Sequence, residues 1–254
     1  MHPTEVSVII PAFNSADSLS RAIDSVLNQT FSSFEIIVVN DCSTDGTDAI
    51  IADYETKIVA VNLNQNQGVG HARNYGIDVS KGKYLAFLDA DDYWQPEKLE
   101  KQLAFMEAYD YAASCCRVDY FALVNDKFKR VFSKKPANDY NPRNYKTLLL
   151  ENKIITSSVM IRKDVLGQSR FKDIRNRQDL ILWVELIKKG VNFGGLDEPL
   201  VAYDLSISGI SKNKFKMILA NYRAFRILLG SSPAAAVYSV ANAVVNLTKR
   251  FIGN

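Results

Sequence analysis

Lys-Tyr-Leu-Ala-Phe-Leu-Asp-Ala-Asp-Asp-Tyr-Trp, residues 83–94, is the stretch around which the chain is organised. Its first part, residues 84–88, is a short apolar run, which predicts a strand buried on both faces. The carboxylates that follow this run are Asp89, Asp91 and Asp92. In open α/β sheets ligands bind beyond the carboxyl ends of the strands. The stretch therefore predicts a binding site at residues 89–92.

The acidic cluster has the composition of a divalent metal site. Asp89 and Asp91 are two positions apart, so an extended backbone would place both carboxylates on one face. Carboxylates that lie close together repel unless a proton or a cation joins them. Mg²⁺ and Mn²⁺ prefer hard oxygen ligands and usually bind through one or two carboxylates plus substrate phosphates. The alternative is an acidic strand end that leads into a helix near Gln95–Glu97.

Composition indicates a globular protein of a reducing compartment. The 254 residues suffice for one large α/β domain or two small ones, and 47% of them are apolar. Three cysteines, of which Cys115 and Cys116 are adjacent, do not make a disulfide framework. The start of the chain lacks the pattern of a signal peptide, and no run of 18 apolar residues occurs. We therefore expect a cytoplasmic protein.

The net charge of +3 hides an asymmetry along the chain. No Asp or Glu follows Asp204, whereas seven basic residues do. The first 204 residues carry 24 basic and 28 acidic side chains. A mildly acidic body with a basic tail predicts that the tail meets an anionic surface.

The first hundred residues alternate between strand and helix patterns. The predicted strands are residues 6–10, 34–39, 58–61 and 84–88, and the predicted helices are residues 19–27, 44–54 and 68–79. Pro11 should end the first strand. Strands separated by helices imply a mostly parallel sheet with helices on both faces. The loops expected to line one crevice are residues 11–14, 40–43 and 89–92.

Two common nucleotide-binding classes are excluded by their missing loops. No Gly-x-Gly-x-x-Gly follows the first strand, which argues against a dinucleotide-binding dehydrogenase. Gly68-Val69-Gly70 supplies the first two glycines, but Arg73 stands where the third should be. The chain also lacks the Gly-Lys-Ser/Thr loop of P-loop enzymes.

Five segments in register resemble family 2 glycosyltransferases. They are residues 6–14 (VSVIIPAFN), 22–29 (AIDSVLNQ), 34–47 (FEIIVVNDCSTDGT), 68–77 (GVGHARNYGI) and 88–92 (LDADD). The resemblance implies the GT-A fold and transfer of a sugar from a nucleotide diphosphate sugar. It implies a nucleotide-sugar-binding half at residues 1–105 and an acceptor-binding half at residues 106–212, and the pattern of the remaining chain predicts basic amphipathic helices at residues 213–254.

The resemblance assigns donor-binding residues by position. They are Pro11, Ala12, Phe13, Asn14, Asp41, Arg73, Asp89, Ala90 and Asp91. Asp41 would accept a hydrogen bond from the uracil ring, although a turn-forming Asp is the alternative. Arg73 would lie near the diphosphate or the base, with a surface arginine as the alternative. Asp89 would reach the ribose or a metal-bound water, and Asp91 would ligate Mn²⁺ or Mg²⁺.

The second half carries fewer signals. The predicted elements are helices at residues 98–109 and 177–189, strands at residues 111–124, 157–161 and 199–203, and a loop or lid at residues 125–145. Gln178-Asp179 opens the second of these helices, where the family commonly has an acidic pair followed by Leu-Trp, here Leu182-Trp183. The resemblance makes Asp179 the general base of an inverting transfer. The alternative is that Asp179 only complements the helix macrodipole.

One departure from the family follows Tyr203. Many relatives continue with Arg, and often with a histidine, that hold the metal or diphosphate; this chain has Asp204. Ser208, Ser211 and Lys212 are the substitutes that the sequence offers.

These signals together predict an inverting, metal-dependent glycosyltransferase. The donor would be a UDP-hexose, and the acceptor a lipid-linked or other oligosaccharide of a bacterial surface polysaccharide; no nucleic-acid partner is expected. One rival is a sugar nucleotidyltransferase, which would need a glycine-rich, Arg-containing loop after the first strand. The other is a non-catalytic carbohydrate-binding homologue with a decayed site.

The tail at residues 213–254 mixes basic and apolar residues in two helical stretches. Asn242 and Asn246 interrupt the second stretch, which is too polar to span a bilayer. We expect both helices to lie on the anionic inner face of the plasma membrane. The alternatives are that they pack on the domain or form a homodimer interface.

Overall fold

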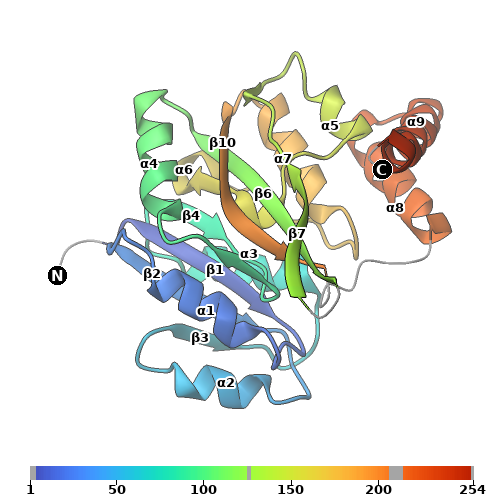
Figure 1. Ribbon diagram of the computed structural model, residues 1–254. Helices are drawn as coiled ribbons and strands as arrows, with labels where there is room; N and C mark the ends of the chain where they lie inside the picture. Colours follow the sequence, from blue (N-terminus) through green and yellow to red (C-terminus); the bar gives the residue numbers. More distant parts are fainter. Residues whose placement is uncertain (1–3, 125–126, 206–213, 253–254) are drawn as a thin grey trace.

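The computed structural model describes residues 4–124, 127–205 and 214–252. One sheet crosses the whole molecule in the order β3-β2-β1-β4-β9-β6-β10-β5, with β7 beside β6 and β8 beside β10. Helices flank this sheet, and the two C-terminal helices gather at one end of the molecule (Figure 1). The α/β fold class expected from the sequence is confirmed.

The N-terminal half alternates strands and helices as predicted. Its elements are β1 (Val6–Ala12), α1 (Leu19–Leu27), β2 (Phe34–Asn40), α2 (Thr47–Asp53), β3 (Val59–Asn62), α3 (Val69–Val79) and β4 (Tyr84–Phe87). The four strands pair in parallel, so their carboxyl ends meet at one edge of the sheet. This edge is where ligands bind in open α/β sheets.

Strand β1 continues past Pro11, where the sequence pattern placed its end. The carbonyl of Ile9 accepts a hydrogen bond from Leu88 N, whereas the carbonyl of Ala12 accepts one from Asp41 N. Alternate residues of β1 therefore bond to opposite neighbours, and the nitrogen of Pro11 faces the side where β4 has already ended. Because no partner is available there, the missing N–H of proline costs no ladder hydrogen bond.

The C-terminal half adds strands in both directions. Its elements are β5 (Asp92–Trp94), α4 (Lys98–Ala108), β6 (Ala113–Val124), β7 (Lys127–Lys134), β8 (Asp139–Tyr140), α5 (Lys146–Leu150), a 3₁₀ turn (Thr156–Ser158), β9 (Met160–Arg162), α6 (Lys163–Leu166), α7 (Gln178–Lys188), β10 (Phe193–Asp204), α8 (Lys214–Leu229) and α9 (Ser232–Ile252). The longest described ladder, β6–β10, is parallel, as are the ladders among β1, β2, β3 and β4. The expectation of a mostly parallel sheet is therefore confirmed.

Two predictions for this half are wrong in detail. Much of the region at residues 125–145, predicted as a loop or lid, is strand: β7 pairs antiparallel with β6, and β8 with β10. The sequence of β7, KFKRVFSK, mixes basic and apolar residues without strict alternation, and its adjacent Val131 and Phe132 are both exposed. The strand expected at residues 157–161 is a 3₁₀ turn followed by the later and shorter β9.

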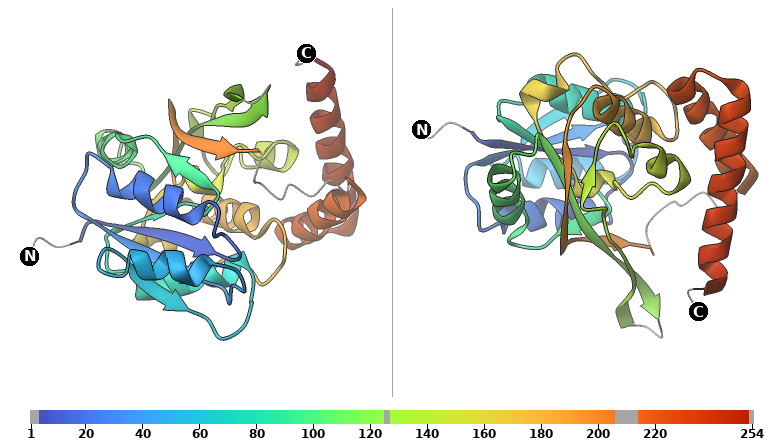
Figure 2. Two further views of the ribbon diagram at one scale, coloured as in Figure 1. Left: turned by 60° about the horizontal axis from the view of Figure 1, so that its bottom comes forward. Right: turned by 90° about the horizontal axis from the view of Figure 1, so that it is seen from above.

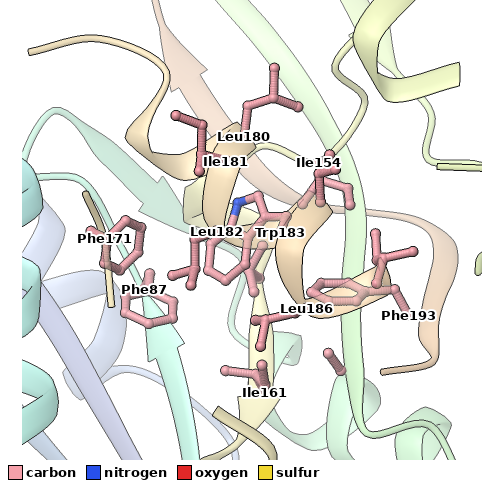
Figure 3. Packing of buried hydrophobic residues seen from close by; sticks show 14 of the residues in the cluster. Phe87, Ile154, Ile161, Phe171, Leu180, Ile181, Leu182, Trp183, Leu186 and Phe193 are labelled. Carbon is pink, nitrogen blue, oxygen red and sulfur yellow. The ribbon is translucent and has the colours of Figure 1, made fainter. Parts of the chain in front are cut away.

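Each face of the sheet carries its own hydrophobic core. Ile9 and Phe87 belong to the cluster that includes residues of α3 and α7, whereas Val8 and Ile10 belong to the cluster that includes residues of α1 and α4. Figure 3 shows the centre of the first cluster, where the Trp183 ring of α7 lies among aromatic rings. The centroids of Phe87, Phe171 and Phe193 are 5.8, 5.6 and 6.0 Å from that of Trp183.

The C-terminal helices pack on the domain with one face. Ala224, Phe225 and Leu228 of α8 and Ala235 of α9 are buried in the same cluster as Trp183. The two helices also pack against each other, and α9 stands as a long rod beside α8 (Figure 2). Within the described ranges, no helix combines the length and the hydropathy that crossing a bilayer requires. Packing on the domain, one of the alternatives for the tail, therefore describes the inner face of both helices.

Candidate active site

A cavity of about 520 Å³ opens at the carboxyl edge of β1 and β2. Its walls are the end of β1, the start of α3 and the loop that precedes α7. The lining residues are Pro11, Ala12, Phe13, Asp41, residues 66–72 and residues 172–175. Four of the predicted donor-binding residues thus share one cavity, whereas Asn14, Arg73, Asp89, Ala90, Asp91 and Asp179 do not line it.

Asp41 is built into the wall of this cavity. The residue is only 2% exposed, and its carboxylate accepts hydrogen bonds from the backbone N–H groups of Gln67 (2.8 Å) and Gly68 (2.7 Å). These contacts tie the end of β2 to the start of α3. Each carboxylate oxygen has a further lone pair, so Asp41 is still able to accept a hydrogen bond from a ligand.

Asn14 holds the loop that follows β2 through two hydrogen bonds. Its Oδ1 accepts a hydrogen bond from Thr44 N at 2.8 Å, and its own N–H donates to Ser43 Oγ at 2.9 Å. The backbone of Asn14 is left-handed (φ 49°), a conformation that Asn tolerates better than most residues. Beside it, the ring of Phe13 is 47% exposed at the cavity, where a flat apolar surface suits a nucleobase.

Arg73 is a buried residue that pairs with Asp89. Its Nη2 lies 2.5 Å from Asp89 Oδ1, and its guanidinium lies 5.3 Å from the centre of the Phe171 ring. Arg73 is 4% exposed, so the alternative of a surface arginine is wrong. Because the guanidinium is fixed between a ring and a carboxylate, it orients Asp89 at the end of β4.

A turn, and not an extended strand, brings the carboxylates of residues 89–92 together. Asp92 N donates to Asp89 O at 3.0 Å, which closes the turn before β5 begins. Burial, together with the nearby charge of Asp89, raises the pKa of Asp91 to about 6. Asp92 is fully buried beside Ser157, whose hydroxyl donates to it, and burial raises the pKa of Asp92 well above its usual range. The turn is therefore an electrostatically crowded place that favours a bound proton or cation.

Arg21 of α1 adds a second positive charge at this crowded turn, besides that of Arg73. Its Nη1 bonds to Asp204 Oδ2 and its Nη2 donates to the carbonyl of Asp91, both at 2.9 Å. The guanidinium also lies 5.0 Å from the centre of the Tyr93 ring. No motif in the sequence marks Arg21; the acid at position 204, where many relatives have Arg, is the signal for a basic partner elsewhere. Ser208, Ser211 and Lys212 lie outside the described residues.

Asp179 stands in the first turn of α7, next to the cavity wall. Thr156 Oγ1 donates to its Oδ2 over a long distance of 3.4 Å. The helix start lies against Gly70 of α3: a Cβ built on Gly70 would be only 3.2 Å from Gln178 Cγ and 3.3 Å from Lys172 O. Glycine at position 70 therefore allows the start of α7 to approach the cavity closely.

Among the described residues, the carboxylate turn at residues 89–92 is the place that the sequence predicted for a metal ion. The part of the chain that the structure describes has no group of three or more His, Cys, Asp or Glu side chains suited to a metal ion. Asp89 and Asp91, however, fit a cation that takes its remaining ligands from substrate phosphates, as Mg²⁺ commonly does. The raised pKa of Asp91 is consistent with this fit, because a nearby cation would favour its ionised form.

Sequence comparisons identify relatives along most of the chain. The family model described as Glycosyl transferase family 2 matches residues 7–169. TuaG of Bacillus subtilis, which carries the name of a teichuronic acid biosynthesis glycosyltransferase, is 37% identical over 87% of each chain. WfaP of Escherichia coli, named as a UDP-Glc:alpha-D-GlcNAc-diphosphoundecaprenol beta-1,3-glucosyltransferase, is 32% identical over 84% of this chain and 82% of its own.

Solved structures support the fold. S. aureus TarS 1–349 in complex with UDP superposes with a TM-score of 0.69 at 20% identity, over 97% of this chain and 72% of that one. A longer TarS chain gives a TM-score of 0.68 at 22% identity, over 88% of this chain and 39% of that one. At such identities the likeness shows the fold alone, here GT-A. Together with the family model and the sequence relatives, it shows that the chain belongs to glycosyl transferase family 2 and is a glycosyltransferase.

Proposed function

We propose that this protein transfers a sugar, with inversion, from a UDP-hexose to a lipid-linked or other oligosaccharide acceptor in bacterial surface-polysaccharide synthesis. The observation that carries the proposal is the cavity between Phe13, Asp41 and the loop that precedes α7. It offers a ring surface and a carboxylate for a nucleobase, and Asp179 stands in the helix beside its wall. The names of TuaG and WfaP support a polysaccharide or lipid-linked acceptor, and the name of WfaP supports a UDP-sugar.

In this proposal Asp179 acts on the acceptor, and the carboxylates of the turn at residues 89–92 act on the leaving diphosphate. Asp179 takes the proton of the acceptor hydroxyl as that oxygen attacks the sugar carbon from the side opposite the diphosphate. Asp89 and Asp91 would hold Mn²⁺ or Mg²⁺, and the bound ion would offset the charge of the leaving diphosphate. Arg73 keeps Asp89 oriented, and Arg21 holds the turn that carries Asp91. Pro11, Ala12, Asn14 and Ala90 shape the donor site mainly through backbone and loop contacts.

A panel of nucleotide sugars tests this function. With Mn²⁺ present, we expect the protein to release UDP from a UDP-hexose faster than it hydrolyses GDP- or CMP-sugars. A sugar nucleotidyltransferase would instead release pyrophosphate from a nucleoside triphosphate and a sugar phosphate. Absence of turnover despite binding of UDP-sugars would favour the non-catalytic homologue.

We further propose that the outer face of the C-terminal helices rests on the inner face of the plasma membrane. Exposed apolar residues of this face are Met217, Ile218, Leu219, Ile227, Val237, Val240 and Val244. Arg223 and Arg226 are exposed on α8 as well. Apolar residues mixed with basic ones suit an anionic lipid surface, at about 1 kcal/mol per basic group.

Charge reversal tests this location better than truncation, since removing α8 would uncover the core around Phe225. We expect the wild type to sediment with vesicles that contain phosphatidylglycerol, and the Arg223→Glu/Arg226→Glu variant to remain in the supernatant. Neutral phosphatidylcholine vesicles are the control. Wild-type protein that ignores the anionic vesicles and sediments as a dimer in solution would assign the same face to a second copy of the chain.

A further inference from the structure

A chain of hydrogen bonds joins the start of α7 to both C-terminal helices. Arg177, the residue before α7, donates from Nε to Asn221 Oδ1 of α8 at 2.7 Å. Asn221 Nδ2 donates to Asn242 Oδ1 of α9 at 2.9 Å. Asn242 Nδ2 then donates to the carbonyls of Leu149 (3.0 Å) and Leu150 (2.7 Å) at the end of α5. The chain therefore links four helices, of which α7 carries Asp179.

The two ends of this chain define the orientation of both amides. A guanidinium only donates hydrogen bonds and a backbone carbonyl only accepts them. Each Asn must therefore turn its oxygen toward Arg177 and its NH₂ group toward α5. Asn221 is 3% exposed and Asn242 is 6% exposed, so bulk water is kept from these bonds. In such a buried network, breaking one link leaves a polar group without its partner, at a cost of about 1–3 kcal/mol.

The backbone at the start of α7 needs such support. Arg177 is left-handed (φ 67°), a conformation that costs a residue with a side chain roughly 1–2 kcal/mol. Its carbonyl accepts the first hydrogen bond of the helix, from Ile181 N at 3.1 Å. The position of Arg177 therefore sets where the first turn begins, and Asp179 projects from that turn.

We propose that Asn221 is a positioning residue for the transfer reaction. Through Arg177 it holds the first turn of α7, and with that turn Asp179, in the place that the reaction needs. This inference rests on the proposed role of Asp179 as the base. The C-terminal helices then serve the chemical step as well as attachment to a surface, and Asn242 is a structural link and not an interruption of an apolar stretch.

Three variants separate positioning from simple stabilisation. Asn221→Ala removes the acceptor for Arg177, Asn221→Asp keeps that acceptor but cannot donate to Asn242, and Asn242→Ala leaves the Arg177–Asn221 bond intact. All three should lower the melting temperature. In UDP-glucose hydrolysis with Mn²⁺, we expect kcat to fall about tenfold in Asn221→Ala alone, at unchanged KM, because misplacing a reacting group costs rate and not donor binding. A kcat that follows the melting temperature across the three variants would overturn the inference.

Arg177→Gly gives an independent test if Asn221→Ala does not fold. Glycine adopts the left-handed backbone without cost, so this variant removes the side-chain link and keeps the turn. We expect the same tenfold loss of kcat, and faster hydrogen exchange of the amides of the first turn of α7 than in Asn242→Ala. Wild-type kcat and exchange in Arg177→Gly would contradict the inference. Asp179→Asn in the same kinetic assay tests the role of Asp179 as the base. The hydrogen-exchange result tests the Arg177–Asn221 link, and it stands whatever the kinetics of Asp179→Asn show.

Discussion

The turn at residues 89–92 and the first turn of α7 both bring carboxylates toward the candidate active site, in opposite surroundings. Asp91 and Asp92 are crowded by burial and by the nearby charge of Asp89, and Arg21 and Arg73 are paired with the groups around them. Asp179 has a single described side-chain contact, the long bond from Thr156. A crowded carboxylate suits a bound cation, whereas a carboxylate with only one weak side-chain hydrogen bond has lone pairs left to accept a bond from an acceptor hydroxyl. The difference supports the division of labour in the proposed mechanism.

The largest effect should come from the uncrowded carboxylate. Asp179→Asn is expected to lower kcat by roughly 10²–10⁴-fold, the usual contribution of a general base, with donor affinity nearly unchanged. Steady-state kinetics with UDP-glucose and a titration of UDP binding measure the two quantities. If UDP binding is lost instead, Asp179 belongs to the donor site, and the two carboxylate turns do not have separate roles.

At the crowded turn the expected loss depends on the metal. Asp91→Asn replaces a charged hard ligand with a neutral amide, so the stimulation of turnover by Mn²⁺ should fall by about 10²-fold. Donor binding should weaken only when Mn²⁺ is present. Asn14→Ala, which removes a loop contact away from this turn, is the control and should keep its response to Mn²⁺. Equal stimulation by Mn²⁺ in Asp91→Asn and the wild type would show that Asp91 does not bind the metal.

Arg21 should matter mainly for the stability of the same turn. Arg21→Leu leaves the buried Asp204 without its arginine and frees the Asp91 carbonyl, at a cost of about 1–3 kcal/mol of unfolding free energy. Arg21→Leu/Asp204→Leu should recover part of that loss, because it also removes the buried carboxylate that Arg21→Leu leaves without its arginine. Urea denaturation measures both. A double variant less stable than the single one would show that Asp204 has a role apart from Arg21.

The smallest effect concerns pH. The pKa of Asp91 is about 6 in the folded protein and near 4 when unfolded, so the folded state binds the proton more tightly. The stability due to this proton is complete below about pH 4 and is lost as the pH rises through 6. In metal-free buffer, the free energy of unfolding of Asp91→Asn relative to the wild type should therefore rise by about 1–2 kcal/mol between pH 4.5 and 7.5. If the difference in unfolding free energy between the two proteins is constant over this range, the charge of the turn is not neutralised by a proton on Asp91.

The sequence by itself determined the donor half of the fold. Apolar runs such as Val8–Ile10 are buried on both faces in the structure, and strand–helix alternation is a local pattern with one common solution, the parallel sheet. The positions of Asp41 and Asp89 at strand ends follow from the same pattern. The pattern did not reveal that Pro11 lies inside β1, since that depends on where the neighbouring β4 ends.

Only the tertiary structure decided which distant residues meet. Arg21 and Asp204 are 183 positions apart, and Arg177 reaches Asn221 and then Asn242 across three helices. No periodicity along the chain encodes such pairs, because a polar side chain finds its partner only after the apolar faces have packed and excluded water from it. Asn242 thus interrupts an apolar stretch in the sequence, whereas in the folded chain it connects α8 and α9 to α5.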